Sequence, residues 1–141
     1  MRVDNKEPKI TTSKCECEAQ TVVVFLTCSG SANCGQIANR AAIKLTEQGV
    51  GNMYCLAGIG SHHQGMIESA KSADRIVVLD GCPTACAKKT TEHAGISVTD
   101  WICVTQNGIK KVHNFKIKEE EVELIVKQTK ELLSKSLNTK K

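Results

Sequence analysis

Apolar and polar positions along this chain alternate in blocks that predict strands followed by helices. Short apolar runs bounded by polar or glycine-containing turns are typical of buried strands. Such runs predict strands over residues 22–27, 52–57, 75–80 and 101–105. Between and after them, apolar residues recur at helical spacing. This periodicity predicts helices over residues 33–48, 64–73, 83–93 and 119–133.

The alternation of strands with helices predicts an α/β fold. Right-handed βαβ crossovers join parallel strands, so this order of elements favours a mostly parallel sheet. The third predicted strand, RIVVLD, is apolar at successive positions, as expected of a strand covered by helices on both faces. We therefore expect a three-layer, four-stranded fold of the flavodoxin-like or Rossmann-like type. In such sheets ligands bind beyond the carboxyl ends of the strands.

The length of the chain, 141 residues, is that of one domain with one core. We expect a mobile polar arm over residues 1–20, a single α/β metal-binding domain over 21–137 and a basic tail over 138–141. The first apolar run begins only at residue 22, so no secretory signal is expected. The longest apolar runs are five or six residues, against the ~20 that a membrane-spanning helix needs. We therefore expect a cytoplasmic protein without a membrane partner.

Composition narrows the partners further. The net charge is +4, but much of the excess positive charge lies in residues 127–141, as in a solvated helix end. Aromatic residues make up only 3% of the chain, so a surface that stacks nucleic-acid bases is not expected. Eight cysteines in a reducing compartment favour metal binding or thiol chemistry over a disulfide framework.

Three cysteines occupy the same point of a repeated strand–helix unit. Cys28 and Cys55, and again Cys55 and Cys82, are 27 residues apart, and each has glycine nearby, in TCSG, YCLAG and DGCP. Neighbouring parallel strands lie about 4.8 Å apart, so thiols at equivalent points of adjacent strands are expected to meet at one edge of the sheet. Thiolates bound to one tetrahedral zinc at about 2.3 Å lie about 3.7 Å from one another, which this spacing can reach.

Two further cysteines begin predicted helices beside these strands. Cys34 lies at the start of the first helix and Cys86 on the first turn of the third. A helix N-terminus stabilises a thiolate and lowers its pKa, which favours metal ligation. A single cysteine at a strand end is usually a small buried hydrophobe, but five at one edge favour a metal site. Cys103, inside the fourth predicted strand, is expected to belong to the core.

Three segments resemble the DGC-domain family of zinc-binding proteins. DGCPTACAKKT resembles the Asp-Gly-Cys motif that names the family, and CSGSANCGQIANRAAIKL and CLAGIG resemble its first and second blocks. The resemblance implies a zinc site made by four chelating cysteines. Carried onto this chain, those ligands are Cys28, Cys55, Cys82 and Cys86. Cys34 is outside that set and is a candidate fifth thiol or exchangeable ligand.

Two phosphate-binding motifs are incomplete in this chain, which disfavours phosphatase chemistry and rules out a P-loop. The segment after the first strand resembles a low-molecular-weight phosphatase loop, but the sixth residue after Cys28 is Cys34 rather than the arginine that clamps an oxyanion. Gly30 and Gly35 have the glycine spacing of a P-loop, but Gln36 and Ile37 follow instead of Lys and Ser or Thr.

Thiol redox chemistry and an iron–sulfur cluster remain open alternatives. Cys28 could act as an attacking thiolate with Cys34 or Cys86 as its resolving partner. Four thiolates can also hold an iron–sulfur cluster, so only the family resemblance favours zinc. No general acid or base is evident at this edge, and no catalytic mechanism is assigned.

Other polar residues carry weaker signals. His62 and His63 lie in the loop after the second strand, where a solvated pair is the simplest expectation and metal ligation or a role as a base the alternatives. Cys15 and Cys17 lie in the predicted arm, as an exposed pair or as a carrier of soft metals. Asp80 is expected to accept N–H bonds from the turn at 81–85. Exposed positions are expected for Lys88, Lys89, His93 and His113.

Overall fold

A four-stranded, all-parallel sheet with the strand order β2-β1-β3-β4 forms the centre of the protein in the computed structural model, which describes residues 20–137. The strands are β1 (Val23–Thr27), β2 (Asn52–Met53), β3 (Arg75–Asp80) and β4 (Asp100–Cys103). The arm and the basic tail predicted from the sequence lie outside the described residues, apart from Gln20.

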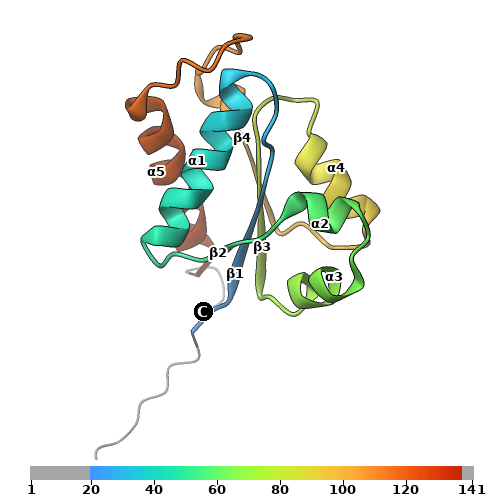
Figure 1. Ribbon diagram of the computed structural model, residues 1–141. Helices are drawn as coiled ribbons and strands as arrows, with labels where there is room; N and C mark the ends of the chain where they lie inside the picture. The colour runs from blue at the N-terminus through green and yellow to red at the C-terminus, as the bar shows by residue number, and fades with distance from the viewer. Residues whose placement is uncertain (1–19, 138–141) are drawn as a thin grey trace, which may run out of the picture.

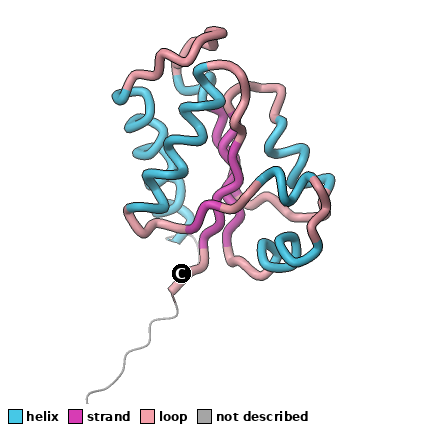
Figure 2. Tube along the Cα trace, in the orientation of Figure 1, coloured by secondary structure: helices cyan, strands magenta, loops and turns pink. Residues whose placement is uncertain are grey.

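Helices cover both faces of the sheet, which confirms the predicted three-layer α/β fold (Figures 1 and 2). Helices α1 and α5 lie against one face, and α2, α3 and α4 lie against the other. The helices are α1 (Asn33–Glu47), α2 (Leu56–Gly60), α3 (Gln64–Lys71), α4 (Cys86–His93) and α5 (Glu119–Leu137), with a 3₁₀ turn η1 (Val104–Asn107) after β4. No helix of this described part has both the length and the apolar character needed to cross a membrane.

The central strands divide their side chains between two cores. In β1, Val23 and Phe25 pack with α1 and α5, whereas Val24 and Leu26 pack with the helices of the other face. All five residues of β1 are buried. Successive side chains of a strand point to opposite faces, so burial of both faces explains why these segments are continuous apolar runs rather than alternating ones.

The strand order creates a switch point at the centre of the sheet. From β1 the chain crosses over one face through α1 to β2, and from β2 it crosses the other face through α2 and α3 to β3. The two crossovers therefore diverge on either side of the boundary between β1 and β3. In doubly wound sheets of this order, the crevice beyond the carboxyl ends of those two strands is the usual ligand site.

The second predicted strand is wrong over most of its length. Only Asn52 and Met53 pair with β1, and the last ladder bond runs from the Tyr54 N–H to the Phe25 carbonyl at 2.9 Å. The chain then leaves the sheet, because Cys55 caps a helix that was not predicted, its Sγ accepting the Gly58 N–H at 3.4 Å. Cys55 is therefore the N-cap of α2 and not the end of a strand.

Other elements differ from the predictions by one to four residues at their ends. Helix α4 begins at Cys86 rather than Pro83, because Ala85 before it is left-handed, with φ of 55°. Strand β4 covers 100–103, and the 3₁₀ turn replaces its predicted last residues. Helix α5 continues to Leu137, past the apolar periodicity.

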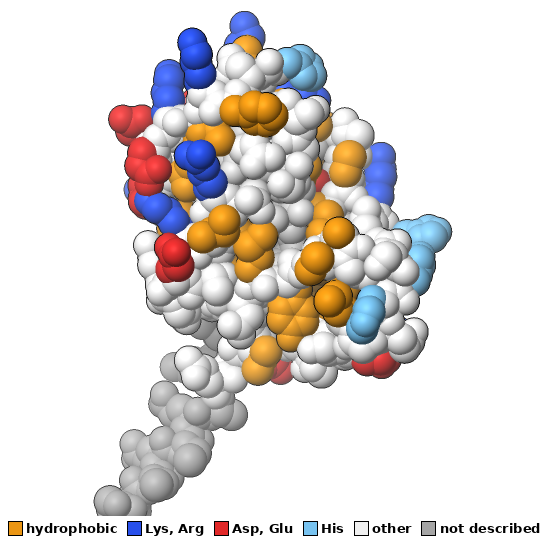
Figure 3. All heavy atoms as spheres, viewed as in Figure 1, with side chains coloured by type: hydrophobic (Ala, Val, Ile, Leu, Met, Phe, Trp, Pro, Cys, Tyr) orange, Lys and Arg blue, Asp and Glu red, His pale blue; other side chains and the backbone are white. Residues whose placement is uncertain are grey.

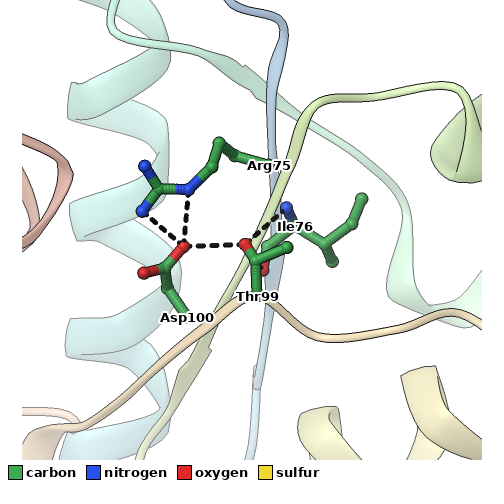
Figure 4. Close-up of polar contacts among 4 residues, drawn as sticks. All are labelled: Arg75, Ile76, Thr99 and Asp100. Carbon is green, nitrogen blue, oxygen red and sulfur yellow. Dashed lines mark hydrogen bonds and ion pairs between the residues drawn. The ribbon is translucent and has the colours of Figure 1, made fainter. Parts of the chain in front are cut away.

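A polar cluster connects β3 with β4 at the amino-terminal edge of the sheet, opposite its carboxyl edge (Figure 4). Nε and Nη2 of Arg75 donate to Asp100 Oδ2 at 2.9 and 2.6 Å. The Thr99 hydroxyl lies 2.7 Å from the same carboxylate oxygen and accepts the Ile76 N–H at 3.0 Å. These side chains help to fix the register of β4 relative to β3, and with it the relative positions of the two strand ends at the carboxyl edge.

Candidate functional site

Four cysteines line one cavity of about 190 Å³ at the carboxyl edge of the sheet, between β1 and β3. Cys28 follows β1 and Cys34 lies in the first turn of α1, while Cys82 follows β3 and Cys86 begins α4. The Cys28 N–H donates to the Leu79 carbonyl at 2.9 Å, so the pairing of β1 with β3 extends to the first thiol. All four are free thiols. The switch point of the fold is thus lined by sulfur.

Close backbone contact between two glycines brings the two halves of this cavity together. A Cβ atom at Gly81 would lie 2.6 Å from the Gly35 nitrogen and 2.8 Å from the Cys34 carbonyl carbon. Distances this short exclude a side chain at Gly81 without backbone movement. The loop after β3 therefore rests directly on the first turn of α1, which places Cys82 beside Cys34.

Asp80 anchors the loop that carries Cys82 and Cys86. Its carboxylate is 1% exposed and accepts the Ala87 N–H at 2.8 Å, the Lys88 N–H at 3.0 Å and the Trp101 indole N–H at 3.0 Å. Asp80 accepts backbone N–H bonds as predicted, but the predicted donors in the turn at 81–85 are wrong: the donors belong to the first turn of α4 and to β4. Asp80 satisfies N–H groups of the helix that begins at Cys86.

A second loop reaches over the cavity and contributes a cation. Asn33, 3% exposed, donates from Nδ2 to the Lys110 carbonyl at 2.9 Å and accepts the Val112 N–H on Oδ1 at 2.7 Å. These bonds place Lys111 at the cavity, where its Nζ donates to Cys82 Sγ at 3.5 Å. His113 lines the same cavity. The sequence did not connect Asn33, Lys111 or His113 with the thiols, because no spacing or motif relates Asn33 to a loop 77 residues away.

The surroundings of Cys82 favour its thiolate. The Thr84 hydroxyl, 3.4 Å from Cys82 Sγ, the Thr84 backbone N–H and the Lys111 ammonium together lower the pKa of Cys82 below its ordinary value. Each of these groups stabilises negative charge on sulfur, which is the form that attacks electrophiles and binds metals.

The neighbouring thiols are shifted in the other direction. Burial raises the pKa of Cys28, and the N–H groups of Gly81 and Gly30 offset only part of the increase. Burial, followed by the charge of Cys82, raises the pKa of Cys34, which is 2% exposed. Cys82 therefore ionises before Cys28 and Cys34.

Comparison with known proteins agrees with the sequence motifs. The sequence profile of the DGC domain matches residues 24–129, from β1 into α5. The chain belongs to the DGC-domain family. A relative of the DGC-domain chain is the anaerobic and virulence modulator AnvM of Pseudomonas aeruginosa, 29% identical over 107 residues, which are 76% of this chain and 82% of AnvM. No solved structure matches the chain.

Cys55 is the one cysteine of the set implied by the family resemblance that does not line the cavity of this DGC domain. It is exposed at the start of α2, and β2, which precedes it, lies on the far side of β1 from β3. Cys103 is 2% exposed, as predicted for a core residue. Within residues 20–137, no group of three or more His, Cys, Asp or Glu side chains is already arranged around a metal position.

Changing Thr84 to valine in the metal-free DGC domain is expected to raise the pKa of Cys82, because the hydroxyl that stabilises the thiolate most is lost. The pH at which alkylation of Cys82 reaches half its maximal rate then moves upward, and the rate at neutral pH falls. Lys111→Met is expected to move it in the same direction, because the ammonium also lowers the pKa of Cys82. Iodoacetamide labelling followed by peptide mass spectrometry measures the profile. Ser31→Ala, a hydroxyl on the same cavity wall, should leave it unchanged, and an equal shift in that variant would refute the assignment to Thr84.

Proposed function

We propose that this DGC-domain protein holds a metal ion, zinc, through cysteine thiolates at the carboxyl edge of its sheet. The observation that carries the proposal is that four free cysteines, two from the β1–α1 connection and two from the β3–α4 connection, line one small cavity at the switch point of the fold. A single buried cysteine is an ordinary core residue. Four around one cavity form a soft donor set that suits zinc or an iron–sulfur cluster.

The residues at the cavity fit such a metal in their chemistry. Thiols must lose their protons to bind, and Cys82, beside Thr84 and Lys111, does so more readily than Cys28 and Cys34. The raised pKa values of Cys28 and Cys34 mean that a bound cation would have to displace their protons. The side chains would also rotate inward, since in the described residues they are not yet grouped around one point. Four-thiolate zinc supplies cross-linking of the loops rather than reaction chemistry.

For the ligand set we propose Cys28, Cys82 and Cys86 with Cys34 as the fourth. The first three are common to the cavity and to the set implied by the family resemblance. What supports Cys34 over Cys55 is its place on the cavity wall and the electrostatic effect of Cys82 on its pKa. Cys55 is separated from the cavity by its position after β2, at the edge of the sheet.

Metal analysis of protein purified under reducing, oxygen-free conditions tests the proposal. We expect one zinc per chain, an absorption spectrum without visible bands, and proton release when zinc is added to the metal-free protein. A broad visible absorption with bound iron would assign the thiols to an iron–sulfur cluster. Protein without any metal, which also fails to take up added zinc, would refute metal binding.

Thiol redox chemistry is a second candidate, favoured by the lowered pKa of Cys82 next to Cys34. The Cys82 thiolate would attack hydrogen peroxide, breaking the O–O bond to give a sulfenic acid and hydroxide. The Cys34 sulfur would then displace the sulfenic hydroxyl group, which leaves as water, to form a disulfide. The description of the relative AnvM as an anaerobic modulator is compatible with an oxygen-sensitive site. A metal-free protein that forms this one disulfide with one equivalent of peroxide would favour redox chemistry over metal binding.

A further inference from the structure

The rings of His62, in a turn, and His93, at the end of a helix, meet edge to face outside the thiol cavity. The ring centroids of His62 and His93 are 5.3 Å apart, with an angle of 71° between the ring planes. His62 lies in the turn between α2 and α3, and His93 is the last residue of α4. Both are exposed, and histidine side chains stand at the surface on the side of the molecule where α2 and α4 lie (Figure 3).

The position of the His62 ring depends on a strained backbone conformation. His62 has φ of 58°, a left-handed conformation that costs a non-glycine residue about 1 kcal/mol or more. Its N–H donates to the Ile59 carbonyl at 3.0 Å, which fixes the turn. Helix α2 also approaches α4 closely, since a Cβ at Gly60 would lie 3.1 Å from Thr90 Cγ2. The turn is thereby held against the end of α4.

The separation of the two rings matches shared coordination of one metal ion. Two imidazoles bound to a tetrahedral zinc through nitrogens at about 2.0 Å would have ring centroids about 5.2 Å apart. Imidazole nitrogen suits Zn²⁺, Ni²⁺ and Cu²⁺. His93 also ends a helix, where the unpaired carbonyl groups favour a nearby positive charge.

We infer that His62 and His93 form a second, exposed site for a divalent cation that prefers imidazole, with water completing its coordination. This site does not depend on the thiol site, because neither histidine lines the cysteine cavity. The two are connected through α4, which begins at Cys86 and ends at His93, a rise of about 10 Å at 1.5 Å per residue. A hydrated metal would thus be held one helix length from the thiols.

Zinc titration observed by NMR at the imidazole Cε1–H groups tests this site. The chain has four histidines, so single variants assign every signal, and zinc is added beyond the amount that the thiols take up. We expect the His62 and His93 signals to shift together with one apparent Kd. In His93→Gln, the zinc concentration that half-shifts the His62 signal should rise at least about tenfold, because a single imidazole cannot chelate the ion together with a second one on the same molecule. In His62→Asn, where asparagine tolerates the left-handed backbone, the zinc concentration that half-shifts the His93 signal should rise in the same way.

His113→Gln is the matched control, since His113 is an exposed imidazole that lies at the thiol cavity rather than at the pair. The comparison is made after the thiols have taken up their zinc. It should leave the apparent Kd of His62 and His93 unchanged, with the backbone amide spectrum showing that every variant is folded. Signals that do not move at millimolar zinc would make the pair an aromatic contact only. An unchanged affinity of His62 in His93→Gln would equally overturn the shared site.

Discussion

Changing Asp80 to alanine is expected to lower the free energy of unfolding by about 3 kcal/mol. The carboxylate is 1% exposed and accepts three hydrogen bonds, from the Ala87 and Lys88 N–H groups and from the Trp101 indole. Hydrogen bonds to a charged acceptor are stronger than neutral ones, and alanine would leave all three donors without it. Denaturant unfolding followed by Trp101 fluorescence measures the change, because the single tryptophan is itself one of the three donors.

The control for this prediction is Asp74→Ala at the other end of β3. Asp74 is exposed and accepts one hydrogen bond, from the Val22 N–H at 2.7 Å, so its loss should cost about 1 kcal/mol or less. If the two variants were equally stable, Asp80 would not be the anchor of the loop that carries Cys82 and Cys86. If Asp80→Ala were too unstable to purify, Asp80→Asn, which keeps one carbonyl acceptor, should fold with an intermediate stability.

The fold was predictable because its signals are local. Each βα unit shows an apolar run followed by helical periodicity, and the preference for right-handed crossovers then leaves few topologies. The error at residues 54–57 has the opposite cause. Tyr54, Cys55 and Leu56 continue the apolar run of β2, but β2 is an edge strand whose pairing ends at Met53. The Cys55 cap of α2 depends on a side-chain hydrogen bond that apolar patterning does not report.

The thiol cluster was only partly predictable, because spacing along the chain does not determine the order of the strands in the sheet. Equal spacing and position at helix starts brought Cys28, Cys34, Cys82 and Cys86 to one edge, where the structure also has them. The spacing of 27 residues implied that Cys55 belongs equally, but equal spacing along the chain does not give equal position in the sheet. Strand β2 lies outside β1, away from the switch point between β1 and β3.

Long-range contacts carried no sequence signal at all. The contact of Gly81 with Gly35 and the bonds from Asn33 to the loop at 110–112 join segments that are far apart in the chain. They decide how close the thiols lie and which cation faces them. A single sequence shows which residues can take part in such contacts but not which of them meet.

Zinc binding is expected to fall by more than about 100-fold in Cys34→Ser and to be unchanged in Cys55→Ser. Loss of an outer-shell partner already costs a metal site about 10–100-fold, and Cys34→Ser would remove a thiolate that contacts the metal. Cys55 is exposed outside the cavity, so serine there should remove only the weak cap at Gly58. Competition with a chromophoric chelator under reducing conditions gives both affinities.

Stability provides an independent measure of the same ligand set. A metal that joins the ends of β1 and β3 with the starts of α1 and α4 stabilises the folded state in proportion to its affinity. Zinc should therefore raise the Tm of the wild-type protein and of Cys55→Ser by equal amounts. It should raise the Tm of Cys34→Ser much less. The reverse result, with zinc lost in Cys55→Ser and retained in Cys34→Ser, would mean that α2 moves to bring Cys55 to the metal. In that case the set implied by the family resemblance would be correct, and the cavity that Cys34 lines would be the metal-free arrangement of the site.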